Sequence, residues 1–349
     1  MFSAAGSGQQ YPFLYAISLA CAEFGAPPWR GTYGTSYYFP TDNEWNWAAS
    51  RRFNCVRLPV RWERCQATLG GALDATYMGR IDAAILKAKE RGMRTILDIH
   101  NYGGYYNAGD AVNEHMIGGG TCTEAHFVDL WTRLAQRYIN DQQAVIFGLM
   151  NEPRGSGEGI TTETWFSAAN AATAAIRAEG WKGLLMVAGN GYSGVAGWTE
   201  TSPTWYGTSN ADYAANYVDS ANNYLFEGHS YWDTDGSGDY SEAPAGNVAN
   251  GTIGTTKITG WINWLRTNKK RGFVGEWGVP SGTNCQAAVE DFMRTVWANR
   301  DVVCGLCWWA AGPWWGDTGG IIMQPTGTGP WTDVAQYAWW RDYMPKPQP

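Results

Sequence analysis

The chain has 349 residues, a formal net charge of −7 and an isoelectric point near 5.2. An acidic chain with no run of Lys and Arg offers no phosphate-binding surface, so nucleic acid is excluded as an expected partner. No stretch of about 18 apolar residues occurs, so neither a transmembrane helix nor a membrane partner is expected.

The aromatic content is unusual, with 21 Trp and 19 Tyr. Some of these rings are expected in the core, because large aromatics bury much apolar area. The number exceeds what packing alone leads us to expect. A groove for polysaccharide would use the excess, since sugar faces stack on flat apolar rings.

The N-terminal residues 1–8 lack the charged start and apolar middle of a secretion signal. We interpret Met1 as an initiator placed on a mature chain, and we expect a secreted monomer.

Because seven is an odd number, the seven Cys leave at least one thiol free. Disulfides between the others are plausible if the protein is exported, but the sequence does not show which Cys would pair. Only Cys304 and Cys307 have the spacing of zinc ligands, but they lie in an apolar strand without a second such pair or a His nearby. No metal and no cofactor are therefore expected.

Strand-like and helix-like segments alternate along the chain. Helical spacing of Ile81, Ile85 and Ala88, followed by Gly92, is typical of the helices. Strands are predicted at residues 14–19, 55–59, 95–100, 145–151, 184–188, 224–229, 273–276 and 303–309, and helices at 74–91, 123–138, 162–179, 255–268 and 287–299. Eight strands with crossover helices favour an α/β fold, a (β/α)8 TIM barrel, over a doubly wound sheet.

Residues 1–349 are expected to form one catalytic domain, because no linker, repeat or composition shift divides them. An α/β barrel often has this length as a single domain. Gly-rich loops at 118–120 and 155–159 follow strands, which places them on the catalytic face of a barrel.

Two of the predicted strands run into glutamates. Glu152 follows an apolar run in Asn151-Glu152-Pro153, and Glu276 ends another in Gly275-Glu276-Trp277-Gly278. The C-terminal ends of barrel strands meet on one rim, so these carboxylates are expected to face each other. Paired carboxylates are the usual machinery of glycoside hydrolysis.

Other strand ends also carry polar or aromatic side chains: Arg57, His100 with Asn101 and Tyr102, Asn151, His229 with Tyr231, and Trp308 with Trp309. Each has an ordinary alternative. A lone Glu after a strand is often a solvated loop residue or a helix cap, Arg57 can pair with a structural carboxylate, and either His can be a satisfied core residue. Their joint occurrence on one rim is what indicates a functional site.

These motifs resemble glycoside hydrolase family 5, along nearly the whole chain. The resembling stretches are Asn151-Glu152-Pro153, Gly275-Glu276-Trp277-Gly278, Ala22-Glu23-Phe24-Gly25, residues 57–64, residues 97–102, residues 231–238 and Trp309-Ala310-Ala311-Gly312. Closest are the fungal and bacterial endo-β-1,4-glucanases of that family. Ser18-Leu19-Ala20-Cys21 departs from the usual start of the first strand, without touching the catalytic set. The carbohydrate-binding module and linker that are frequent in the family are not seen.

The resemblance implies a retaining endo-β-1,4-glucanase acting on a β-glucan by double displacement, with Glu152 as acid/base and Glu276 as nucleophile. Arg57 would keep Glu276 ionised, Tyr231 would donate to the same carboxylate, and the like charge of Glu276 would keep a proton on Glu152. The substrate-binding set that the resemblance implies is Arg57, His100, Asn101, Tyr102, Asn151, Trp198, His229, Tyr231, Trp309 and Trp314. In this set Asn151 would bond the sugar 2-hydroxyl, Trp309 would lie beneath the reacting ring, and Tyr102, Trp198 and Trp314 would line neighbouring subsites.

Two alternatives stay open for the activity. A β-mannanase or a xylan- or xyloglucan-directed hydrolase of the same family would share the catalytic residues. A non-catalytic carbohydrate-binding barrel would be favoured by loss of either glutamate, and both are present. The loop at 233–239 copies the first half of a calcium loop, but its twelfth position is Pro244 rather than Glu, so calcium is not expected.

Overall fold

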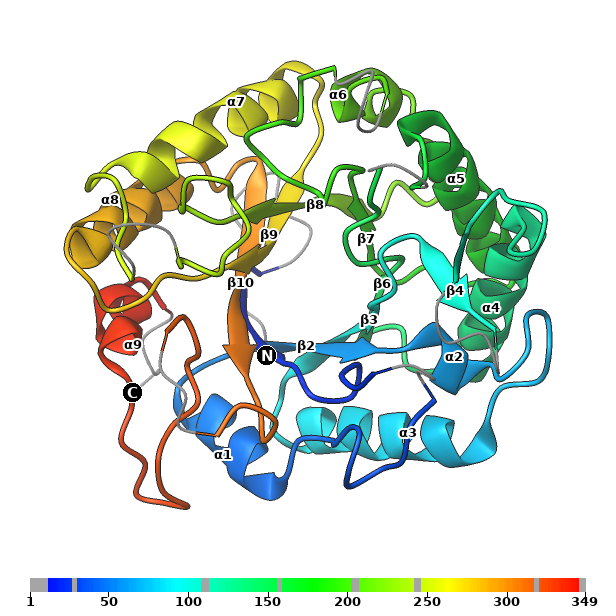
Figure 1. Cartoon of the computed structure of the whole chain (residues 1–349), viewed down its shortest axis with the longest axis horizontal. Coiled ribbons are helices and arrows are strands. Elements are labelled where there is room, and N and C mark those ends of the chain that lie inside the picture. Colours follow the sequence, from blue (N-terminus) through cyan, green and yellow to red (C-terminus); the bar gives the residue numbers. More distant parts are fainter. Residues whose placement is uncertain are drawn as a thin grey trace.

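Eight parallel strands close into a barrel in the computed structural model of the protein, surrounded by helices (Figure 1). The structure describes residues 12–26, 30–107, 113–155, 159–201, 207–241, 246–316 and 320–344. Around the barrel the order is β1-β10-β9-β8-β7-β6-β3-β2. The strands are β1 (Leu14–Leu19), β2 (Cys55–Val60), β3 (Arg94–Ile99), β6 (Val145–Gly148), β7 (Leu185–Ala188), β8 (Tyr224–Ser230), β9 (Gly272–Trp277) and β10 (Val303–Ala311). The predicted (β/α)8 barrel is confirmed.

Helices follow most strands on the outside of the barrel. They are α1 (Asp42–Ser50), α2 (Trp62–Cys65), α3 (Ala75–Glu90), α4 (Glu124–Arg137), α5 (Thr162–Ala178), α6 (Asn210–Ala214), α7 (Ile253–Thr267), α8 (Cys285–Ala298), α9 (Ala335–Trp340) and the 3₁₀ turn Arg341–Tyr343. A small antiparallel pair, β4 (Gly104–Tyr106) and β5 (Glu114–Met116), lies beyond the end of β3. None of the helices in the described part of the chain has the length and apolar character needed to span a membrane.

The five predicted helices are confirmed as α3, α4, α5, α7 and α8, but α1, α2, α6 and α9 were not predicted. A signal for α1 is present in the sequence. Thr41 and Glu44 form a capping box, in which the Thr41 backbone N–H donates to Glu44 Oε2 at 2.8 Å.

The barrel interior has an apolar layer at the N-terminal half of the strands. Its members are Leu14, Ala16, Cys55, Ile96, Ile146, Leu184, Met186, Leu225, Phe273, Cys304 and Cys307. Side chains of a strand alternate between its two faces, so the next inward position lies two residues further along. At that level β2, β3 and β8 present Arg57, Asp98 and Glu227, all buried. A charged layer therefore rests directly on an apolar one, below the C-terminal rim.

The seven cysteines are all buried and unpaired, so the disulfides that the sequence left open are not formed. Residues 1–8, on which the expectation of a mature N-terminus rests, lie outside the described residues, as does part of the Gly-rich loop at 155–159.

Candidate active site

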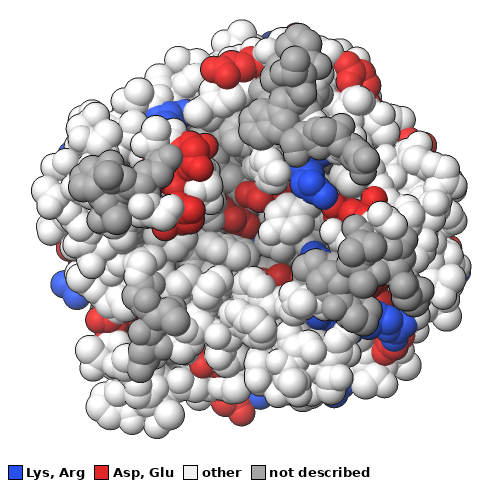
Figure 2. All heavy atoms as spheres, in the orientation of Figure 1, with Lys and Arg blue, Asp and Glu red and all other residues white. Residues whose placement is uncertain are grey.

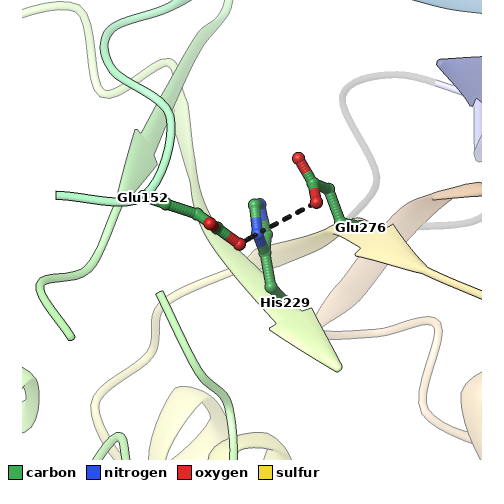
Figure 3. Close-up of side chains that lie close together, drawn as sticks. All are labelled: Glu152, His229 and Glu276. Atoms are coloured by element: carbon green, nitrogen blue, oxygen red, sulfur yellow. Dashed lines mark hydrogen bonds and ion pairs between the residues drawn. The ribbon is translucent and has the colours of Figure 1, made fainter. Parts of the chain in front are cut away.

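Glu152 and Glu276 face each other across the C-terminal rim of the barrel, with His229 between them (Figure 3). Glu276 lies in β9, and Glu152 follows β6 with a left-handed φ of 42°. One carboxylate oxygen of each glutamate and a ring nitrogen of His229 all lie within 4.8 Å of one another. Retaining glycosidases hold their carboxyl groups about 5–5.5 Å apart and inverting ones about 6.5–9.5 Å apart. The facing oxygens are therefore close enough for the short carboxyl separation of a retaining pair.

Both oxygens of Glu276 accept hydrogen bonds. Arg57 Nη1 donates to Oε1 at 2.7 Å, and the Tyr231 hydroxyl donates to Oε2 at 2.8 Å. Burial raises the pKa of Glu276, while the cations His229 and Arg57 oppose that rise and Glu152 adds to it. The two donors therefore fix the orientation of the Glu276 carboxylate.

His229 links two carboxylates. Its Nδ1 lies 2.5 Å from Glu152 Oε1, and its Nε2 lies 3.2 Å from Glu227 Oε1. Burial disfavours the imidazolium, but the charges of Glu276 and Glu152 outweigh it and raise the pKa of His229 to about 10. A proton is therefore held between His229 and Glu152 at neutral pH.

His100 and Asn151 form a second part of the network. Asp98 Oδ2 lies 2.8 Å from His100 Nδ1, which leaves His100 Nε2 as the acceptor for Asn151 Nδ2 at 3.2 Å. Burial and the positive charge of Arg57 hold the pKa of His100 well below its ordinary value, so the ring is neutral. Arg57 Nη2 donates to Asn151 Oδ1 at 2.7 Å. One N–H of the Asn151 amide is left over from these two bonds.

Two of the predicted substrate-binding residues, Arg57 and Asn101, are buried, and their polar atoms bond other parts of the protein. Arg57 is 0% exposed, so it supports Glu276 and Asn151 instead of contacting a substrate. Asn101 is 1% exposed, its amide nitrogen donates to Glu63, and its oxygen accepts from the Trp62 backbone N–H. The prediction that Asn101 binds substrate is wrong, because both ends of its amide join the loops after β2 and β3.

The predicted aromatic subsite residues divide into two kinds. Trp309 in β10 is half-buried and stacks on His100, with ring centroids 5.3 Å apart and planes 13° apart. Tyr102 is half-buried, with its hydroxyl 3.3 Å from His100 Nε2. Trp314 is 36% exposed and stacks on Phe24 at 5.1 Å. All three rings are partly exposed, so their prediction as subsite residues stays a prediction.

Trp198 is different, and its prediction as a subsite residue is wrong. It is 0% exposed and packs edge-on against Phe226 of β8 and Trp261 of α7, at 5.8 and 6.0 Å between centroids. Trp198 therefore belongs to the core between the barrel and its outer helices.

A cavity of about 860 Å³ opens beside the pair, between the loops after β7 and β8. Its lining includes Glu152, Tyr192, Glu200, Asp235 and Lys257, while Glu276 lies outside that lining. Figure 2 shows that the face is hollowed at its centre, with acidic side chains at the bottom. The cavity therefore lies on the side of the pair where Glu152 stands.

Two buried carboxylates in the network were not predicted. Asp98 Oδ2 and Glu227 Oε1 lie 3.2 and 3.1 Å from Arg57 Nη2. The sequence carried a signal for both. Each stands in an apolar strand two residues before a histidine of the rim, and therefore on the same inward face.

A metal ion has no obvious place at this site. Glu152, His229 and Glu276 are the one group in the described residues with ligand atoms close enough to share an ion. Both ring nitrogens of His229 already face carboxylates, at 2.5 and 3.2 Å, so the imidazole offers no free lone pair.

The loop at 233–239 is closed by its own hydrogen bonds. Asp233 Oδ2 accepts from Gly238 N at 2.8 Å and from Ser237 Oγ at 3.0 Å. Lys257 Nζ donates to the Asp233 carbonyl at 2.7 Å, which places a positive charge where calcium would need negative ones. Pro244 lies outside the described residues.

Known proteins are similar to this chain in sequence and in fold. The family described as Cellulase (glycosyl hydrolase family 5) matches residues 18–312. Endoglucanase 3 of Humicola insolens is 31% identical over 317 residues, covering 90% of this chain and 74% of that protein. The crystal structure of an endo-beta-1,4-glucanase of Xanthomonas axonopodis pv. citri has 35% identity and a TM-score of 0.85, covering 94% of this chain and 98% of that one. A structure of XacCel5A in complex with cellopentaose has 36% identity and the same TM-score, covering 95% and 99%. The chain therefore belongs to the cellulase family, glycosyl hydrolase family 5.

Proposed function

We propose that this protein is a retaining endo-β-1,4-glucanase that cleaves internal bonds of cellulose and related β-glucans. The observation that carries the proposal is the pair of glutamates, whose facing oxygens lie within 4.8 Å of each other on the rim of the barrel. Relatives along most of the chain are endo-β-1,4-glucanases, and one similar structure holds cellopentaose. Family and geometry thus support the same reaction.

In the first step, Glu276 attacks the anomeric carbon while the proton shared by His229 and Glu152 passes through Glu152 to the leaving oxygen. The glycosidic C–O bond breaks, a C–O bond to Glu276 forms, and the shortened chain leaves through the cavity beside Glu152. Esterification removes the negative charge of Glu276. That charge favoured the imidazolium of His229. With the proton of the first step passed to the leaving group, Glu152 can accept a proton from water. The resulting hydroxide displaces Glu276 and restores the original configuration.

The transition state gains from the neighbouring groups. The remaining N–H of Asn151 is suited to the sugar 2-hydroxyl, a contact that strengthens as positive charge develops on the ring. Arg57 and Tyr231 hold Glu276 at both oxygens, which limits the motion needed for attack. Trp309, packed flat on His100, offers its other face to the reacting ring.

The aromatic roles predict different kinetic effects for Trp309→Ala and Trp314→Ala. Trp309 lies against the catalytic network, so its loss should lower kcat as well as raise KM. Trp314 stacks on Phe24, which is not part of the hydrogen-bond network of the glutamates, so the loss of Trp314 should mainly raise KM, by roughly 5- to 10-fold if it contributes about 1 kcal/mol or more. Steady-state kinetics on cellopentaose measure both. A Trp309 variant with a sharply lowered melting temperature but unchanged kinetics in the folded enzyme would assign this ring to the core instead.

The substrate is tested by a panel of soluble polysaccharides. Release of reducing ends should be fastest from carboxymethylcellulose, and slower from glucomannan and xylan. Faster attack on glucomannan or on xylan would make the enzyme a mannanase or a xylanase with the same catalytic pair. Binding to any of them without release of reducing ends would make the protein a binding barrel. Viscosity should fall early in the reaction, as expected for internal cleavage.

We also propose that the protein acts outside the cell as a monomer. Cellulose is an insoluble polymer that cannot enter a cell, so the enzyme must reach it. Light scattering of the purified protein tests the monomer, and activity in the medium of the source culture tests secretion.

A further inference from the structure

Glu227 lies beneath the catalytic pair, in the charged layer of the barrel. It precedes His229 by two residues in β8, so both side chains point inward. Glu227 is buried, and no role for it follows from the reaction itself, because it is too deep to touch a substrate.

A single oxygen of Glu227 contacts the supports of both catalytic glutamates. Its Oε1 lies 3.1 Å from Arg57 Nη2 and 3.2 Å from His229 Nε2. Arg57 in turn donates to Glu276 at 2.7 Å, and His229 faces Glu152 at 2.5 Å. The buried Glu227 carboxylate is thus separated from Glu276 by one side chain, Arg57, and from Glu152 by one side chain, His229.

The backbone makes room for this carboxylate. A Cβ at Gly275, the residue before the nucleophile, would lie 2.1 Å from Glu227 Oε1 and 2.5 Å from its Cδ. No side chain larger than hydrogen fits there unless Glu227 moves. The glycine beside Glu276 therefore fixes where the Glu227 carboxylate stands.

Charged or titratable groups from all the neighbouring strands lie next to His229 or next to one of its carboxylate partners. They are Arg57 from β2, Asp98 from β3 and His100 just after it, Glu152 after β6, Glu227 from β8 and Tyr231 just after it, and Glu276 from β9. The cation Arg57 disfavours the imidazolium, and the carboxylates favour it. Glu227 faces Nε2 of the ring at 3.2 Å, at the opposite end from Nδ1, which faces Glu152 at 2.5 Å.

We propose that Glu227 is a positioning residue that holds Arg57 and His229 together and keeps the proton shared by His229 and Glu152 in place. This inference rests on the proposed function for its kinetic consequence, but not for its effect on His229. Loss of the Glu227 charge, with the shape kept, removes a stabilising partner of the imidazolium. Glu227→Gln should therefore release that proton at lower pH.

The first measurement follows the ring nitrogens of His229 by ¹⁵N NMR in the free enzyme. The wild-type ring should stay doubly protonated well above pH 7, and in Glu227→Gln it should lose its proton at a pH lower by about one unit or more. Gly275→Ala should shift the titration in the same direction, because the new methyl group displaces the carboxylate without removing it. If one of these two variants fails to fold, the titration of His229 in the other is enough to test the inference.

The second measurement is the pH dependence of kcat/KM on a soluble β-glucan. The rate falls at high pH when the acid/base loses its proton, so this descending limb should move to lower pH in Glu227→Gln. Glu63→Gln is the matched control: Glu63 is equally buried, but it binds Asn101 and the Tyr106 backbone N–H and neither catalytic glutamate. The descending limb of the pH profile of Glu63→Gln should not move.

The outcomes separate this inference from the proposed function. An unchanged His229 titration in Glu227→Gln, with only a lower melting temperature, would make Glu227 a structural residue and overturn the inference. A shifted titration in a protein that cleaves no glucan would support the inference and overturn the function.

Discussion

Replacing Glu276 with Gln should lower kcat on soluble cellulose derivatives by roughly 10³-fold or more, which corresponds to about 4 kcal/mol of barrier. An amide cannot form the glycosyl ester, so double displacement is lost at its first step. Gln has nearly the shape of Glu and can still accept a hydrogen bond from Arg57. The melting temperature and the binding of cellopentaose should therefore change much less than the rate.

Chemical rescue gives the sharper test of the nucleophile. In Glu276→Gly a small anion such as azide can enter the space of the missing carboxylate and attack an aryl β-glycoside. It approaches from the same face as Glu276, so the product should be the inverted glycosyl azide. Glu124→Gln, at the start of α4 on the outside of the barrel, is the control and should keep its activity. Residual activity above a tenth of wild type in Glu276→Gln would assign the nucleophile to another group.

The barrel and the facing positions of Glu152 and Glu276 could be predicted because both leave local patterns. Buried strands appear as short apolar runs, and Glu152 and Glu276 interrupt such runs at their C-terminal ends. Since parallel barrel strands share one rim, these positions meet whatever the loops do. The predicted contact of Arg57 with Glu276 is also present, at 2.7 Å.

The role of an aromatic ring was harder to predict, because packing and sugar stacking use the same side chains. At least 12 of the 21 Trp have under 2% of their surface exposed, so most of the aromatic excess fills the core. Trp198 follows a strand and Trp309 lies near the end of one, yet only Trp309 is partly exposed. The difference depends on how α7 packs behind β8, which no local pattern encodes.

The buried carboxylates were missed because a charge inside a barrel is rare unless it is paired. Asp98 and Glu227 have their common partner in Arg57, which lies far away in sequence. Arg57 was itself predicted to bind substrate, whereas it is fully buried and serves as the cation of this layer. A charge two residues before a rim histidine is the pattern that would have suggested the layer.

Replacing Glu152 with Gln should damage hydrolysis of cellulose far more than cleavage of an aryl glycoside with a good leaving group. A sugar leaving group needs the proton of Glu152, and an acidic phenol does not. Formation of the glycosyl ester on Glu276 should therefore survive with the aryl substrate. Its hydrolysis should lag, because no carboxylate is left to take the proton from water.

The observable consequence is a burst. Stopped-flow mixing of Glu152→Gln with excess aryl cellobioside should release about one equivalent of phenol per enzyme quickly and the rest slowly. Added azide should speed the slow phase, since an anion needs no base to attack, and should give the retained glycosyl azide because it enters from the face of Glu152. His229 loses one carboxyl partner in this variant, at the 2.5 Å contact, but keeps Glu227 and Glu276 nearby, so the fold should persist. Equal losses on both substrates, without a burst, would remove Glu152 from the role of acid/base and leave the proton donor to be sought elsewhere on the rim.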